Sequence, residues 1–269
     1  MQKKSLSMPI CYFYWEEFVK QWQCGGKSIN GWSDPNCIPL YNTPGGNMSS
    51  LYIPEPWWGN NGTQLLHSVV INFNPGEGKC GQEKVNFPCG CSYAYDVVGN
   101  PSVLKNTRKW HKSKRAMRIL NALCRNGSIK KIYCLENHLS VELIPWHTQK
   151  VEKSYMDYLK KNILAIYEHS ICFAANESRR IGNSILKNVV IVRMNDKRTK
   201  IVLHELCKNG VPSKIIRSGV STSGNGRYME FCFPSSKDIK DIRFICIWGR
   251  KSRNDFPPSC DMDDIIRMI

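Results

Sequence analysis

The chain has 269 residues, of which 42% are hydrophobic and 22% charged. These proportions are ordinary for a globular protein and exclude collagen, coiled coil and a disordered chain. The 38 Lys and Arg residues outnumber the 22 Asp and Glu residues, and the resulting net charge of +16 favours nucleic acid or another polyanion as partner. A lysine-rich protein without such a partner would have the same composition.

The expected compartment follows from what the sequence lacks. No stretch approaches the roughly 18–20 consecutive apolar residues of a membrane span, and no apolar segment follows the lysines of residues 1–9 as in a signal peptide. We therefore expect a cytoplasmic protein without membrane contact, with reduced thiols at its 13 cysteines. A metal site at Cys80, Cys89 and Cys91 stays open as the lesser alternative, because no Cys-x-x-Cys pair occurs. We expect neither a metal nor a cofactor.

The hydrophobic pattern alternates between helical and strand-like periods. In chain order it predicts a short helix within 10–24, a loop-rich stretch at 25–64, a strand at 66–73, a helix at 113–124, a strand at 139–144, a helix at 152–168, a polar helix from near 174, a strand at 188–194, a helix at 199–206, strands at 214–217, 227–233 and 243–248, and a helix at 261–269. Such alternation is typical of a sheet with crossover helices. The strands at 66–73, 139–144 and 188–194 are expected to be parallel neighbours.

We therefore predict a single α/β domain of three-layer α/β/α type with a mostly parallel central sheet. Its core is expected at 65–240, with a helix and loop-rich extension at 1–64 and a closing strand and helix at 241–269. Ligands in open α/β sheets bind beyond the carboxyl ends of the strands. Three predicted strand ends carry unusual residues: 72–78 (NFNPGEG), 141–148 (VELIPWHT) and 231–236 (FCFPSS).

The first of these loops is not a phosphate-binding loop. Phe73 and Cys80 stand where that motif requires Gly and Ser or Thr. The three loops together instead resemble the uracil-DNA glycosylase superfamily. The segment 72–76 resembles the Asn-Pro-Gly first motif of its mismatch-specific uracil/thymine branch, whereas 54–59 and 141–148 resemble poorly characterised bacterial members. Phe233-Pro234-Ser235 falls where the family's second motif, His-Pro-Ser or Asn-Pro-Ser, ends a late strand, and the resemblance spans roughly residues 51–240.

The resemblance implies slow base excision by hydrolysis of the N-glycosidic bond, with Asn74 positioning the attacking water. Phe233 replaces the family's His or Asn that contacts the leaving base, so either His147 supplies that contact or the chemistry is lost. The implied base pocket comprises Phe73, Gly76, Glu77, Trp146, Phe233 and Ser235, with Glu77 as a second candidate base. Three alternatives stay open: a simple turn at 74–76, a non-catalytic nucleic-acid-binding protein with this fold, and an enzyme acting on a small molecule or nucleotide.

A basic stretch gives separate support for a polyanionic partner. Residues 101–131 contain ten Lys and Arg and no Asp or Glu, which suits salt-dependent phosphate contacts. A second candidate is the Gly/Ser-rich loop between Arg217 and Arg227, which could also be a plain hairpin connection. We expect a monomer that binds nucleic acid, DNA rather than RNA. The expected contact residues are Arg108, Lys109, Lys112, Arg115, Arg118, Arg217 and Arg227.

Overall fold

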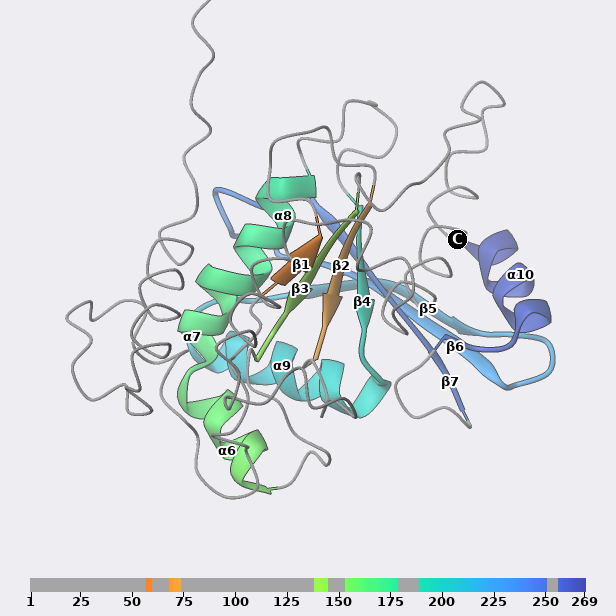
Figure 1. Ribbon diagram of the computed structural model, residues 1–269, viewed down its shortest axis with the longest axis horizontal. Helices are drawn as coiled ribbons and strands as arrows, with labels where there is room; N and C mark the ends of the chain where they lie inside the picture. Colours follow the sequence, from red (N-terminus) through yellow and green to blue (C-terminus); the bar gives the residue numbers. More distant parts are fainter. Residues whose placement is uncertain (1–56, 60–67, 74–137, 145–152, 179–188, 251–255) are drawn as a thin grey trace, which may run out of the picture.

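The computed structural model describes residues 57–59, 68–73, 138–144, 153–178, 189–250 and 256–269. Seven strands form one mixed sheet in the order β1-β3-β2-β4-β7-β6-β5 (Figure 1). Their bounds are β1 Trp57–Gly59, β2 Ser68–Asn72, β3 His138–Glu142, β4 Val189–Arg193, β5 Lys214–Val220, β6 Gly226–Cys232 and β7 Arg243–Gly249. The centre of the sheet, β3-β2-β4-β7, is parallel, whereas β1 at one edge and the β5–β6 hairpin at the other are paired antiparallel.

The described helices follow β3, β4 and β7. Their bounds are α6 Lys153–Lys161, α7 Ile163–Ile166, the π-helical η3 Tyr167–Cys172, α8 Phe173–Ser178, α9 Asp196–Lys208 and α10 Ser259–Met268. Asn162 separates α6 from α7, and its side chain donates to the main-chain oxygen of Tyr158 at 2.9 Å. Asn195 begins α9, since its side-chain oxygen accepts from the amide of Arg198 at 3.0 Å. In these described ranges no helix has the length and apolarity to cross a membrane.

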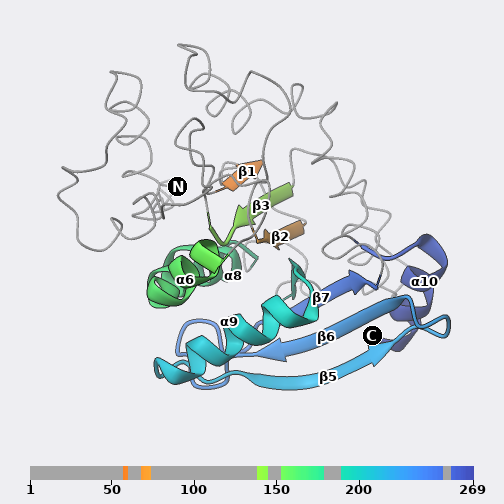
Figure 2. The same cartoon turned by 90° about the horizontal axis from the view of Figure 1, so that it is seen from below.

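Helices lie on both faces of the sheet. Phe231 on β6 faces α9, because it lines a cavity together with Val202 and Leu203 of that helix. Gly226 lies five residues earlier on β6 and faces α10, since a Cβ on it would lie 2.9 Å from the Asp261 side chain. Side chains alternate along a strand, so these two contacts belong to opposite faces. Figure 2 shows α9 and α10 lying along different parts of the sheet.

The central strands are buried because they consist almost wholly of β-branched residues. Val69, Val70 and Ile71 of β2 and Val189–Val192 of β4 are at most 2% exposed, as expected for parallel strands covered on both faces. The prediction that the strands at 66–73, 139–144 and 188–194 are parallel neighbours is confirmed. The α/β class is confirmed as well. The expectation of a mostly parallel sheet needs correction, because three of the six strand pairings are antiparallel.

Candidate functional site

A buried polar cluster lies at the carboxyl ends of three adjacent parallel strands. Asn72 ends β2, and its amide nitrogen donates to the Ser140 hydroxyl and, at 3.1 Å, to the Glu142 carboxylate, both on β3. Its amide oxygen accepts from Arg193 Nη1, at the end of β4, at 2.9 Å. Asn72 is 7% exposed and Glu142 2%. One amide therefore connects an acid and a base across three strands.

The strand register brings these residues together. Asn72 lies opposite Glu142 on one side and opposite Arg193 on the other, and Ser140 shares a face with Glu142 because it lies two residues earlier. The neighbouring Ile71 points to the α9 face, so the cluster lies on the opposite face. Burying a carboxylate is costly unless hydrogen bonds compensate for lost water. The amide of Asn72 supplies part of that compensation.

The residue after Asn72 belongs to the packing of the helices. Phe73 is 3% exposed, its ring centroid lies 5.7 Å from that of Tyr155, and the Arg198 guanidinium lies 4.6 Å above it. Burial, and secondarily the negative charge of Glu142, raise the pKa of Tyr155 well above its ordinary value, so its hydroxyl stays protonated. Burial lowers the pKa of Arg198 from its ordinary value. The ring of Phe73 thus lies between α6 and α9, in the packing rather than against a ligand.

The ladder between β2 and β3 continues beyond both strands. The amide of Leu143 donates to the oxygen of Asn72 at 2.8 Å, and that of Ile144 donates to the oxygen of Phe73 at 3.1 Å. Phe73 and Ile144 are the last described residues before the segments 74–78 and 145–148. The two segments singled out in the sequence therefore begin from neighbouring strands at the same edge of the sheet.

Most of the residues predicted to form the site lie outside the described residues. They are Asn74, Gly76, Glu77, Trp146 and His147, the basic residues Arg108, Lys109, Lys112, Arg115 and Arg118, and the thiols Cys80, Cys89 and Cys91. Their predicted roles stay predictions. Within the described ranges, no cluster of His, Cys, Asp and Glu could hold a metal ion.

The structure contradicts the grouping of Phe233 and Ser235 with that edge. Both residues follow β6, which runs antiparallel to β7. Near the end of β6, Phe231 pairs with Phe244 of β7, and Phe244 pairs on its other side with Val190 near the start of β4. Phe233 therefore lies toward the amino ends of the parallel strands. It is fully buried, with its ring 5.5 Å from that of Tyr167 and 5.3 Å from that of Phe244, whereas Ser235 is exposed.

The guanidinium of Arg217 is bound to other groups of the protein. Its Nε binds the Glu230 carboxylate, which is 1% exposed and also accepts from Arg243 at 3.1 Å. Its remaining nitrogens donate to the main-chain oxygens of Met268 and Ile269. The Gly/Ser loop is the turn of the β5–β6 hairpin, the plainer of the two interpretations of the sequence. Arg227 is half-buried within that hairpin, opposite Trp248.

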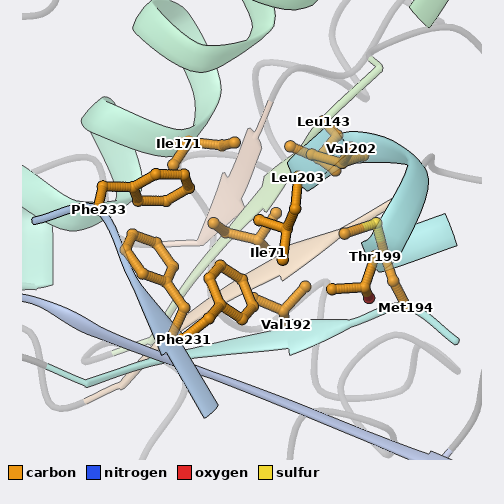
Figure 3. A pocket seen from close by; sticks show the side chains of 11 residues that line it. Ile71, Leu143, Ile171, Val192, Met194, Thr199, Val202, Leu203, Phe231 and Phe233 are labelled. Carbon is orange, nitrogen blue, oxygen red and sulfur yellow. The ribbon is translucent and has the colours of Figure 1, made fainter. Parts of the chain in front are cut away.

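The cavity under α9 is a packing gap rather than a binding site. Ile71, Val192, Phe231 and Phe233 line it together with residues of α9 (Figure 3). Its volume of about 10 Å³ would hold at most one water molecule. The hydroxyl of Thr199, the polar side chain in its lining, is bonded to the oxygen of Asn195 at 3.0 Å. A base or nucleotide would not fit there.

Sequence reasoning did not single out Asn72, Ser140, Glu142 or Arg193. Asn72 and Glu142 lie within the two segments quoted from the sequence, and Arg193 ends the run VVIVR. The available signal was a polar residue at the last position of each of three apolar strands. Comparison of the chain with protein-family models, with curated proteins and with solved structures finds no match.

Proposed function

We propose that the protein acts on nucleic acid at the carboxyl edge of β2, β3 and β4, as a slow base-excising glycosylase of the uracil-DNA glycosylase type. The observation that carries the proposal is the parallel pairing of β2 with β3, from whose ends the segments 74–78 and 145–148 begin. The net charge of +16 suits a phosphate-rich partner.

The proposed reaction hydrolyses the bond between a base and its sugar. Water adds to the anomeric carbon of the sugar, the bond to the base nitrogen breaks, and the base leaves with the bonding electrons and takes up a proton. Asn74 would orient that water, and an amide is a weak base, so a slow reaction is expected. His147 would contact the departing base. Phe233 has no part in the proposal, because β6 ends at the opposite edge.

The buried cluster has a positioning role in this proposal. The reaction develops positive charge on the sugar and negative charge on the base, and fixed charges of opposite sign stabilise both. Glu142 and Arg193 carry those signs, and Asn72 binds both of them. By binding both, Asn72 would hold the ends of β2, β3 and β4 in a fixed relation to one another.

Release of free base from single-stranded and double-stranded oligonucleotides tests the proposal, with uracil-containing and mismatched strands as substrates. We expect slow release, reduced about 10²–10³-fold in Asn74→Ala and in His147→Ala, the usual loss on removal of one preorganised group. Asn176→Ala is the matched control, because Asn176 is exposed on α8 and should leave the rate unchanged. Full activity of Asn74→Ala would place the site elsewhere.

A non-catalytic nucleic-acid-binding protein is the second candidate. The observation in its favour is the position of Phe233, which leaves the family's second motif away from the proposed site. It predicts binding that weakens steeply as salt rises, without release of base from any strand. Charge reversal at Lys112, Arg115 and Arg118 together should weaken that binding; unchanged affinity would remove the basic stretch from both proposals.

A further inference from the structure

β5 lies at one edge of the sheet that the described strands form. It is the last strand in the sheet order, and Figure 2 shows it outermost among the described strands. Ile215, Ile216 and Val220 on this seven-residue strand are 45–49% exposed. An edge strand offers unpaired main-chain groups to any added strand, and exposed apolar side chains favour that addition.

The usual protections of an edge strand are weak here. A free charged side chain in the middle of the strand would repel a second strand, but Arg217 is bound to Glu230 and to the main-chain oxygens of Met268 and Ile269. The register irregularity falls at Ile216, which has no partner on β6, and it ends the regular pairing that runs from Arg217 to Val220. The remaining charge, Lys214, stands at the first position of the strand.

We infer that β5 is the interface of a symmetric dimer, in which β5 of a second copy pairs with it antiparallel. Pairing centred on Ser218 sets Ile216 of each copy opposite Val220 of the other, and Arg217 opposite Gly219. This register forms two apolar cross-strand pairs, each between Ile216 of one copy and Val220 of the other, and sets no like charges directly opposite each other. A twofold axis uses the same patch on both copies, which suits a self-complementary strand.

The proposed dimer is an alternative to the monomer expected from the sequence, and it does not depend on the proposed function. It joins two seven-stranded sheets into one continuous sheet. The two copies run in opposite directions across the axis, so their Asn72 clusters lie at opposite edges of the joined sheet. Two polyanion-binding surfaces can then work independently. Because each copy carries a net charge of +16, rising salt should strengthen dimerisation, whereas it weakens nucleic-acid binding.

Sedimentation velocity over a range of protein concentrations measures the dimer directly. The natural chain should approach twice its mass of 30.9 kDa. Ile216→Lys and Val220→Glu should each weaken dimerisation about tenfold or more, because each disrupts both cross-strand apolar pairs. Leu164→Lys is the matched control: Leu164 is 47% exposed on α7, so this variant should dimerise normally. Circular dichroism spectra verify that each variant is folded.

A mixture of the two β5 variants tests the register. Pairing centred on Ser218 sets the new lysine opposite the new glutamate and leaves one Ile216–Val220 pair intact, so the mixture should dimerise more tightly than either variant alone. A natural chain that stays at 30.9 kDa at every concentration would overturn the dimer, and β5 would then be free for strands of other proteins. Dimers that resist both substitutions would overturn the interface, and a mixture that stays monomeric would overturn the register.

Discussion

Replacing Asn72 with leucine tests whether the cluster stabilises the sheet as its geometry indicates. Leucine has nearly the shape of asparagine but neither donates nor accepts a hydrogen bond. The variant loses the bonds to Ser140, Glu142 and Arg193. A buried bond to a charged group is worth roughly 1.5–3 kcal/mol and a neutral one about 1 kcal/mol. Arg193 is only half-buried, so water can replace part of its loss, and we expect a total destabilisation of about 3 kcal/mol.

Urea unfolding followed by circular dichroism measures this change as a shift in midpoint at constant slope. Asn209→Leu is the control, because Asn209 makes an exposed bond to the oxygen of Glu205 at the end of α9. It should change the free energy of unfolding by at most about 0.5 kcal/mol. If Asn72→Leu unfolds at the natural midpoint, Asn72 does not hold Glu142 and Arg193, and the positioning role fails with it.

Two further predictions concern stability. Hydrogen bonds from Ser221 and Ser223 lower the pKa of Asp261 below its ordinary value. The carboxylate therefore stabilises the fold above the unfolded pKa of about 4, and this stabilisation is lost as pH falls through the folded pKa. Asp261→Asn should lower the melting temperature at neutral pH, with the difference shrinking in acid, and an equal difference at every pH would refute this. Phe233→Ala should cost about 3–5 kcal/mol as a core truncation, with release of base per folded molecule unchanged; a selective loss of release would return Phe233 to the site.

The parallel centre of the sheet was predictable because local composition determines it. Runs of β-branched residues such as 189–192, separated by helical sequence, favour parallel strands with crossover helices. The antiparallel hairpin had a signal as well. Only five residues separate Val220 from Gly226, whereas a parallel connection needs a dozen or more. That loop length predicts β6 antiparallel to β5, and the crossover through α9 predicts β5 parallel to β4. Together they give the direction of β6 and the place of Phe233.

The cluster was harder to predict because it depends on register. Asn72 and Glu142 are 70 residues apart and Asn72 and Arg193 are 121 apart, and no local pattern says which residues of two strands stand opposite each other. A shift of one residue in β3 would have placed Val141 beside Asn72 and turned Glu142 to the other face. The sequence indicated that strand ends carry polar residues. The structure adds that Asn72, Glu142 and Arg193 lie on one face of the sheet and stand opposite one another in the strand register.

This arrangement bears on the proposed chemistry through the direction of the strands. β2, β3, β4 and β7 run in one direction and β6 runs against β7, so the last residues of β6 lie away from the carboxyl ends of those four strands. Breaking a glycosidic bond separates charge, positive on the sugar and negative on the base, and preorganised charges or dipoles of opposite sign lower the barrier. Asn72 is uncharged and has both a donor and an acceptor, so it binds Glu142 and Arg193 together without adding a charge of its own. An aspartate or a lysine at that position would bind only one of them and repel the other.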